Sequence, residues 1–475
     1  MQDQILIGGK WLDGAGGDRI SVTDPATGKE VATVAAGTPA DATAAVDAAA
    51  IAQKQWAQTP PRERAEILRN CWSTLLAHSD ELAEIIVREH GKPLADAKGE
   101  IAYAAEFFRW NSEEAVRIHG SIGTAPAGNN KIIVRHPPVG VVVMVTPWNF
   151  PAAMITRKVA PALAAGNAAV IKPAKETPLT ALRIGELLHE AGVPAGVVNV
   201  VPTLTAGSWF EAATAHDATR MVSFTGSTEV GRVLLKRCAD RVLKVAMELG
   251  GNAPFIVFND ADVDAAVEGA MTAKMRHSAE TCTAANRFFA ESEIADAFTA
   301  KLAKAMGAIK TGSGFDESVT CGPLINADAV LTVTALVDEA VNSGAQVAVG
   351  GSAIAGSGFF YEPTVLGNVA EGSAITTQEI FGPVAPIISF TDTDAMIDQA
   401  NDTEMGLAAY VYSGDIGRGL NVCERLESGM VGLNRGAMSD PAAPFGGMKQ
   451  SGLGREGASE GIYEFCETQY IAASW

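Results

Sequence analysis

The stretch GVVVMVTPWNFPAAMITRKVAPALAAGNAAVIKP, residues 140–173, decides the fold. It begins with seven residues that are almost all apolar and β-branched, which is typical of a strand buried on both faces of a parallel sheet. Residues 152–166 predict a helix that ends at Gly166, and residues 168–173 predict a second short strand. A strand, a helix and a strand in this order predict a parallel βαβ unit.

The same alternation continues toward the C-terminus. Residues 177–192 predict a helix that starts at a Thr-Pro signal, and further strands and a helix are predicted at 196–201, 219–224 and 228–239. A second series begins with a strand at 253–258, a helix at 260–276 and a strand at 345–351. We therefore expect two doubly wound α/β domains with parallel sheets. The first 120 residues read as mostly helical after a short β segment at 5–14.

Composition excludes several classes of partner. The chain has 475 residues, with 36 Lys and Arg against 55 Asp and Glu, so its formal charge is −19. Such an acidic chain repels phosphate backbones and anionic lipid, so we expect no nucleic-acid or membrane partner. Residues 137–156 carry no charge over a membrane-spanning length, but Pro147, Asn149 and Pro151 interrupt them and favour a strand followed by a turn.

Cysteine usage and the N-terminus indicate the compartment. The six cysteines are far apart and form no C-x-x-C pair, so neither a metal site nor a disulfide framework is predicted. Scattered thiols suit a reducing environment. The first residues lack the basic and apolar regions of a secretory signal. We expect a cytoplasmic protein without a bound metal.

Several motifs could carry chemistry, and each also has an ordinary structural explanation. Cys282, within HSAETCTAANRF (277–288), is a candidate nucleophile or a small buried filler. Asn149 follows the most apolar strand and is a candidate oxyanion donor or a turn residue. Glu248 ends a strand and is a candidate general base or a partner for a lysine. Gly226, in FTGSTEVG (224–231), and Lys172 and Lys175, in IKPAKETP, could bind phosphates or lie in plain loops.

Together these motifs carry a resemblance. PWNFP, ALAAGNAAVIKPA, FTGSTEVG, MELGGNAPFIVF, ETCTAANRF, QEIFGPVAPI and PFGGMKQSGLGREG occur in the order expected of the aldehyde dehydrogenase superfamily. The resemblance covers essentially the whole chain. Within the superfamily the chain looks most similar to succinate-semialdehyde dehydrogenases, on ITRKVAPALAAG, KMRHSAETC, NDTEMGLAAYVY and GAMSDPAAPFGG.

The resemblance implies a domain organisation. Residues 1–120 and 141–249 would form the NAD(P)-binding domain, and residues 250–432 the catalytic domain. Residues 121–140 and 455–475 would form a small bridging β element for oligomerisation. We therefore expect a homo-oligomer, either a dimer or a tetramer.

It also implies the roles of particular residues. Cys282 matches the nucleophile, Glu248 the general base and Asn149 the oxyanion donor. The cofactor-binding residues would be Trp148, Lys172, Lys175, Gly226, Ser227, Glu379 and Phe381. The residues that would hold a remote carboxylate of the substrate are Arg157, Arg276 and Ser439. Two guanidinium groups and a hydroxyl suit an anionic tail.

The expected reaction is oxidation of succinate semialdehyde to succinate through a thiohemiacetal and a thioester on Cys282. Because many NAD-preferring relatives carry a glutamate where Lys175 stands, we expect NADP to be used at least as well as NAD. One alternative is a dehydrogenase for another short ω-oxo acid, such as glutarate semialdehyde. Another is a non-catalytic, cofactor-binding member of the fold.

The loop before the nucleophile departs from the pattern of the family. Relatives commonly read N-x-G-Q-x-C, whereas this chain has His277, Ala279 and Glu280. Glu280 could raise the pKa of Cys282 through like charge, and Ala279 is costly if its φ must be positive. Position 284 is alanine where some relatives carry a second cysteine, so we expect no redox-switch disulfide.

Overall fold

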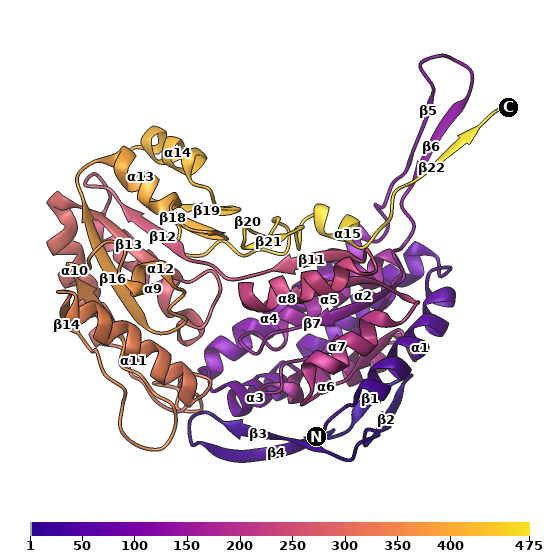
Figure 1. Cartoon of the computed structure of the whole chain (residues 1–475), viewed down its shortest axis with the longest axis horizontal. Helices are drawn as coiled ribbons and strands as arrows, with labels where there is room; N and C mark the ends of the chain where they lie inside the picture. Colours follow the sequence, from indigo (N-terminus) through magenta and orange to yellow (C-terminus); the bar gives the residue numbers. More distant parts are fainter. Residues whose placement is uncertain (1) are drawn as a thin grey trace.

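The computed structural model describes residues 2–475 and arranges them as two α/β lobes and a projecting arm (Figure 1). The first lobe is built on an eight-stranded sheet. In spatial order its strands are β2 (Lys10–Leu12), β1 (Ile5–Ile7), β9 (Val198–Val200), β8 (Ala168–Lys172), β7 (Val141–Val145), β10 (Thr219–Thr225), β11 (Lys244–Glu248) and β21 (Gly452–Leu453).

The middle strands of this sheet, from β9 to β11, are parallel, as the sequence predicts. The outer strands β1, β2 and β21 pair antiparallel, which the βα alternation does not predict, because they belong to no βαβ unit. The helices of the lobe are α1 (Pro39–Trp56), α2 (Pro61–Ala77), α3 (Ser79–His90), α4 (Leu94–Glu114), α5 (Ala153–Ala165), α6 (Pro178–Glu190), α7 (Ala206–Ala215) and α8 (Thr228–Ala239).

Two apolar clusters hold these helices on the two faces of the first sheet. Alternate residues of β7 enter different clusters, with Val142 and Met144 in one and Val141 and Val143 in the other. This split follows from the period of a strand, whose successive side chains point to opposite faces. The helix over 153–165 ends at Gly166, whose φ of +98° is a left-handed C-cap.

The second lobe repeats the arrangement with seven strands. Their order is β14 (Gln346–Val349), β15 (Thr364–Gly367), β16 (Val384–Phe390), β13 (Ala285–Glu291), β12 (Ala253–Val257), β18 (Ala408–Tyr412) and β19 (Met430–Leu433), and only β14 pairs antiparallel. Its helices are α9 (Val263–Met275), the 3-10 turn η1 (Arg276–Ala279), α10 (Ser292–Gly307), α11 (Ala327–Asn342), α12 (Ala374–Thr377), α13 (Thr393–Asn401) and α14 (Ile416–Arg425).

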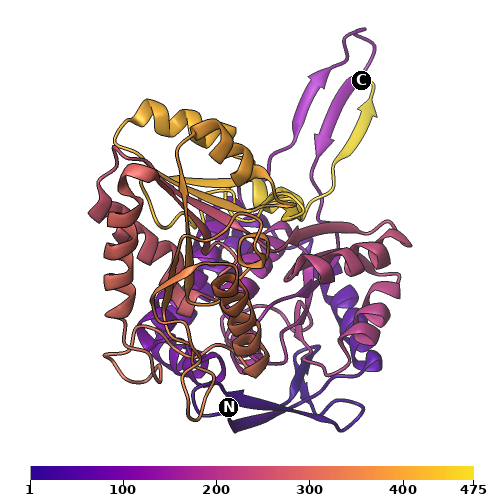
Figure 2. The same ribbon diagram turned by 60° about the vertical axis from the view of Figure 1, so that its left-hand side comes forward.

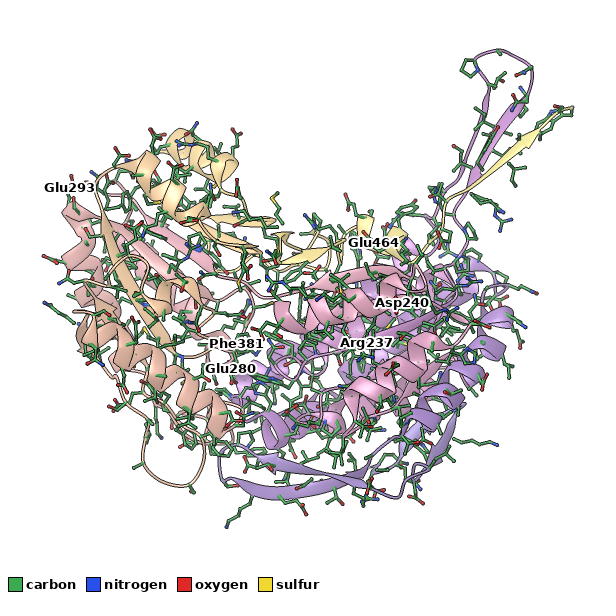
Figure 3. All side chains as sticks on the ribbon, in the orientation of Figure 1. Arg237, Asp240, Glu280, Glu293, Phe381 and Glu464 are labelled. Carbon is green, nitrogen blue, oxygen red and sulfur yellow. The ribbon has the colours of Figure 1, made fainter. Side chains whose placement is uncertain are left out.

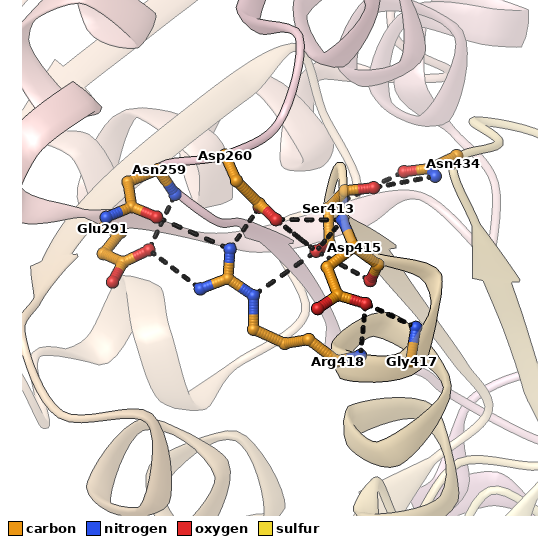
Figure 4. Close-up of polar contacts among 8 residues, drawn as sticks. All are labelled: Asn259, Asp260, Glu291, Ser413, Asp415, Gly417, Arg418 and Asn434. Atoms are coloured by element: carbon orange, nitrogen blue, oxygen red, sulfur yellow. Dashed lines mark hydrogen bonds and ion pairs between the residues drawn. The ribbon is translucent and has the colours of Figure 1, made fainter.

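A polar network fixes α14 to the carboxyl ends of three strands of the second sheet, β12, β13 and β18 (Figure 4). Arg418 on α14 forms an ion pair with Asp260 and lies 3.9 Å from a carboxylate oxygen of Glu291. Ser413 donates to Asp260 at 3.1 Å. These contacts lie at the carboxyl ends of the strands, whereas Cys282 precedes the amino end of β13. We therefore assign them to the packing of the second lobe.

The arm is a three-stranded antiparallel sheet of β22 (Gln469–Ala473), β6 (Lys131–Arg135) and β5 (Ser121–Thr124). It projects from the body in both views, with the C-terminus at its tip (Figures 1 and 2). Residues 455–468, which we expected in this bridging element, lie on the first lobe instead. They include α15 (Glu460–Glu464), and their apolar side chains Ile462 and Phe465 are buried in the core of that lobe.

Two short pairings complete the fold, namely the hairpin of β3 (Arg19–Asp24) with β4 (Lys29–Ala35) and the pair of β17 (Met405–Gly406) with β20 (Met448–Lys449). Within residues 2–475, no helix has both the length and the apolar composition needed to cross a membrane.

The strand order of the first sheet reverses between β7 and β10. From β7 the chain proceeds through β8 and β9 on one side, and then continues with β10 and β11 on the other. Ligands of open α/β sheets bind at the carboxyl ends of strands where the order reverses in this way. Trp148 and Asn149 directly follow β7, and Gly226 and Ser227 directly follow β10.

Candidate active site

Two cavities meet at Cys282. One, which we call the arginine cavity, has a volume of about 260 Å³ and is lined by residues that include Arg157, Arg276 and Ser439. The other, the tryptophan cavity, has a volume of about 210 Å³ and is lined by residues that include Trp148. Cys282 and Met154 line both cavities. The thiol therefore stands where two ligands entering from different sides would meet.

Cys282 is a half-buried residue at the end of a tightly packed loop. Burial is the main reason that its pKa is raised to about 12, and the nearby Glu379 carboxyl acts in the same direction. Arg157 acts in the opposite direction. A Cβ atom on Gly251 would come within 2.4 Å of the carbonyl oxygen of Cys282, so glycine is required there for the β11–β12 connection to pass this loop. At neutral pH the thiol is protonated and needs a base.

Glu248 ends β11, as predicted, and is almost fully buried. Burial first, and then the carboxylate of Glu456, raise the pKa of Glu248 well above its usual range, while Arg157 and Lys158 oppose the shift. Its Oε2 atom has no hydrogen-bond partner among the described residues. A buried carboxyl with a raised pKa and a free oxygen has the properties of a general base that works near neutrality.

Asn149 is buried at the carboxyl end of β7. Its Nδ2 atom donates to the backbone oxygen of Glu280 at 3.0 Å, which joins the turn after β7 to the loop before Cys282. Within residues 2–475, the second Nδ2 hydrogen has no acceptor. Asn149 and Cys282 both line the tryptophan cavity. An amide in this position can donate to an oxygen that develops charge next to the thiol.

The loop before the nucleophile has a left-handed backbone. His277, Ser278 and Ala279 have φ values of +52°, +58° and +67°, so the condition under which alanine is costly at position 279 is met. Hydrogen bonds from outside fix the loop, because His277 N donates to Asp96 at 2.9 Å and Gly322 N donates to Ser278 Oγ at 2.8 Å.

Glu280 is held by groups other than the thiol. Its carboxyl accepts from Ile325 N at 2.9 Å and lies 3.8 Å from His90 Nε2, and all of these side chains are buried. Burial raises the pKa of Glu280 well above its usual range. The charged side chains with the largest effects on the pKa of Cys282 are Glu379, Arg157 and Glu248. Figure 3 shows Glu280 and Phe381 where the two lobes meet.

The tryptophan cavity brings together the residues expected to bind a cofactor. Its lining includes Trp148, Gly226, Ser227, Glu379 and Phe381. The Trp148 and Phe381 rings pack edge to face with centroids 5.4 Å apart. Glu379 accepts from Gly251 N at 3.3 Å, and burial raises its pKa to about 7. A Cβ atom on Gly250 would stand 3.2 Å from Glu379, so the bare glycine keeps this wall open.

Of the phosphate- and ribose-binding candidates, Gly226 and Ser227 line this cavity, whereas Lys172 and Lys175 do not. Ser227 is the exposed N-cap of α8, where free backbone N–H groups favour an anion. Lys172 ends β8 and is largely buried, and burial lowers its pKa to about 8. Lys175 is exposed, with its Nζ atom 4.0 Å from Glu176. Aromatic rings, a carboxylate and a helix N-terminus on one cavity are groups that fit a dinucleotide.

The arginine cavity is lined by the three residues expected to hold a carboxylate, but these residues differ in their burial and in their ion-pair partners. Arg157 is 2% exposed, and its Nε atom lies 2.5 Å from Glu456. Its guanidinium also lies over the Phe445 ring, 3.8 Å from the centroid. Arg276 follows α9, is only half-buried and has no partner for its buried Nε. Ser439 is half-buried.

Sequence reasoning missed part of this cavity. Asp96, Glu100 and Tyr103 on α4 line it together with Phe150 and Phe445. The stretch GKPLADAKGE reads only as a charged helical segment, and no local pattern indicates that it faces a site about 180 residues away. Within residues 2–475, no group of three or more His, Cys, Asp or Glu side chains is placed to hold a metal ion.

Comparison with known proteins identifies the family. The model of the aldehyde dehydrogenase family matches residues 11–471. A succinate-semialdehyde dehydrogenase of Paenarthrobacter nicotinovorans is 55% identical over 441 residues, which is 93% of this chain and 98% of that protein. A glutarate-semialdehyde dehydrogenase of Pseudomonas putida is 48% identical over 100% of this chain and 98% of that protein.

A solved structure agrees with these sequence matches. An NADP-dependent enzyme of E. coli superposes with a TM-score of 0.98 at 47% identity, over 100% of this chain and 98% of that chain. A family match over nearly the whole chain, a fold match of this quality and the meeting of two cavities at a half-buried cysteine all agree. The chain belongs to the aldehyde dehydrogenase family.

Proposed function

We propose that the protein catalyses the NAD(P)-dependent oxidation of succinate semialdehyde to succinate. The observation that carries this proposal is the position of Cys282 on the shared wall of the two cavities. A semialdehyde in the arginine cavity would present its carbonyl carbon to the thiol, and a nicotinamide in the tryptophan cavity would lie on the other side of the same sulfur.

Cys282 is the proposed nucleophile. The thiol is neutral at pH 7, so its proton must leave to solvent water before the sulfur adds to the aldehyde. The sulfur adds to the aldehyde carbon and gives a thiohemiacetal. When bound, the nicotinamide supplies the acceptor for the hydride that leaves this carbon. The carbon is then a thioester on Cys282, and water activated by Glu248 releases the carboxylic acid.

Asn149 is the proposed donor to the oxyanion of the thiohemiacetal, together with the backbone N–H of Cys282. Its free Nδ2 hydrogen and its place beside the thiol support this role. A donor of this kind is typically worth about 10²–10³ in rate.

NADP is the proposed preferred cofactor, with NAD also used. Trp148, Glu379 and Phe381 would hold the nicotinamide half, and Gly226 and Ser227 would contact phosphate. Lys172 would contact the adenosine ribose. Lys175 supports NADP, because a cation there attracts a 2′-phosphate and a carboxylate would repel it.

Arg276 and Ser439 are the proposed contacts of the remote carboxylate, with Arg157 behind them. The similarity to a glutarate-semialdehyde dehydrogenase favours a second candidate substrate that is one carbon longer. Both aldehydes have the same charged tail, so the same guanidinium group would hold either one.

We also propose roles for the domains and for the arm. Residues 1–120 and 141–249 would bind the cofactor, residues 250–432 would supply the nucleophile, and the arm would join copies of the chain into a dimer or tetramer. The arm exposes Ile122, Tyr470, Ile471 and Trp475, which supports a protein partner on it. All six cysteines are free, which supports a reducing compartment such as the cytoplasm.

Initial rates on a panel of aldehydes, with NAD and NADP in parallel, test the proposal. Succinate semialdehyde should give the highest kcat/KM, glutarate semialdehyde a lower one and butanal a much lower one. A higher kcat/KM for butanal than for either semialdehyde would overturn the substrate class. No formation of reduced cofactor with any aldehyde would overturn the activity.

A further inference from the structure

A buried ion pair lies beside the active site, where Glu100 lines the arginine cavity, and the proposed chemistry assigns the pair no role. Lys92 precedes α4 and Glu100 lies within it. Their side chains are fully buried, and Lys92 Nζ lies 2.6 Å from Glu100 Oε2. Replacing a buried ion pair by apolar residues is often neutral or stabilising, so stability alone does not account for this pair.

Both members of the pair bind the turn that carries Asn149. Lys92 Nζ donates to the backbone oxygen of Asn149 at 2.7 Å. The same Nζ lies over the ring of Phe150, 4.5 Å from its centroid. Glu100 Oε1 accepts from the backbone N–H groups of Ala152 and Ala153 at 2.8 and 3.2 Å. The pair thus fixes the backbone on both sides of the turn between β7 and α5.

The turn is in contact with the loop that carries the nucleophile. Asn149 Nδ2 donates to Glu280 O, two residues before Cys282, and Asp96 on α4 accepts from His277 N. Residues 92–100 therefore bind both the turn that carries Asn149 and the loop that precedes Cys282. A shift of the Asn149 backbone would move its amide with respect to the sulfur, because the side chain has few rotatable bonds.

We propose that Lys92 and Glu100 are positioning residues that hold the Asn149 amide at the oxyanion of the substrate. This inference rests on the proposed function, because it assigns the pair a role in the addition of Cys282 to the aldehyde. Neither side chain need touch the reacting atoms. The pair acts through the carbonyl oxygen of Asn149 and the N–H groups at the start of α5.

The test uses single-turnover formation of reduced cofactor by the full-length enzyme. Lys92→Met should slow this step about 10- to 100-fold, less than complete loss of an oxyanion donor. KM for the aldehyde and Kd for NADP should stay within about twofold of wild type, since neither ligand contacts Lys92. The single-turnover rate with butanal should fall by the same factor as the rate with succinate semialdehyde, because both aldehydes form the same oxyanion.

A double-mutant cycle with Asn149→Ala separates positioning from general damage. Once the amide is absent, Lys92→Met should cost less than about twofold further, because it has nothing left to position. Lys274→Met is the matched control, since it removes another fully buried lysine, one that forms no hydrogen bond or ion pair within residues 2–475. Any loss from Lys274→Met should persist undiminished in the Asn149→Ala background.

Lys92→Met leaves the buried Glu100 carboxylate without its partner, which is strongly destabilising, so a second variant is needed in case Lys92→Met folds poorly. Lys92→Met with Glu100→Gln removes both charges together and should fold, with the same slow hydride step. A Lys92 effect that multiplies with that of Asn149→Ala, or a double variant with the wild-type rate, would overturn the inference. Wild-type enzyme inactive on every aldehyde would instead overturn the proposed function, so the two failures are distinguishable.

Discussion

Arg157 and Glu456 form a buried ion pair, with 2.5 Å between Nε and Oε2, on the wall of the cavity that faces Cys282. Glu456 also binds Lys158 at 2.6 Å, so one carboxylate serves two cations. Much of the charge of Arg157 is therefore directed away from a ligand. Arg276 lines the same cavity without such a partner. Of the two arginines, Arg276 is the one free to bind a substrate carboxylate.

Arg276→Ala should lower kcat/KM for succinate semialdehyde by about one to two powers of ten, because a charge-assisted hydrogen bond is worth roughly 1.5–3 kcal/mol. The kcat/KM for butanal should change little, since butanal has no carboxylate to bind Arg276. The measured quantity is the ratio of the two losses, which cancels general damage to the site. Equal losses would mean that Arg276 holds the loop in shape and does not bind the carboxylate.

Glu248→Gln should leave hydride transfer in place and slow release of the acid. We expect a burst of reduced cofactor close to one per active site, followed by a steady state slower by about 10²–10⁴. In the wild type the release step should accelerate as pH rises, because the base form of Glu248 is populated only above its raised pKa. Loss of the burst itself would assign Glu248 to an earlier step.

Cys282 should react slowly with iodoacetamide in the cofactor-free enzyme at neutral pH, because burial raises the pKa of its thiol to about 12. Its alkylation rate should increase about tenfold per pH unit from pH 7 to pH 10, whereas a model thiol levels off above its pKa of about 8.5. Cys282→Ala, which should also abolish oxidation, supplies the background from the other five thiols. A plateau below pH 8 would contradict the expectation.

Lys175→Glu should shift the preference from NADP toward NAD. The new carboxylate would repel a 2′-phosphate and accept from ribose hydroxyl groups. Because the side chain of Lys175 is 64% exposed, the replacement should not disturb folding. Lys175→Gln is the control, since it removes the cation without adding an anion and should give a smaller shift. An unchanged ratio of kcat/KM for the two cofactors in Lys175→Glu would exclude a role for this position.

Ala279→Gly should stabilise the protein, because Ala279 has a φ of +67°, which glycine adopts without the steric cost of a Cβ atom. The expected gain is about 1 kcal/mol, seen as a rise of about one degree in the thermal midpoint. Ala265→Gly, at an exposed position within α9, is the matched control and should lower the midpoint by a similar amount. A fall in the midpoint of Ala279→Gly would mean that the methyl group is needed for packing.

Local sequence was sufficient for the central elements of the first lobe. A continuous apolar run gave β7, and a Thr-Pro signal marked the start of α6, because these patterns depend only on neighbouring residues. The order of the motifs, through the family resemblance, predicted one site for Cys282, Glu248 and Asn149. The structure places Cys282 and Asn149 on one cavity, whereas Glu248 lines neither of the two cavities at the thiol. The antiparallel outer strands and the place of residues 455–468 were not predictable in this way.

The electrostatic state of the site was decided only by the tertiary structure. From the sequence, Glu280 is a carboxylate two residues from the thiol and Arg157 is a free cation. In the fold, Glu280 faces His90 and Ile325, and Arg157 faces Glu456. Lys92 reaches Asn149 across 57 residues of chain. Such pairings are set by how distant segments pack, and burial then amplifies them, because in a water-poor interior the nearest charge or dipole controls the energy of each group.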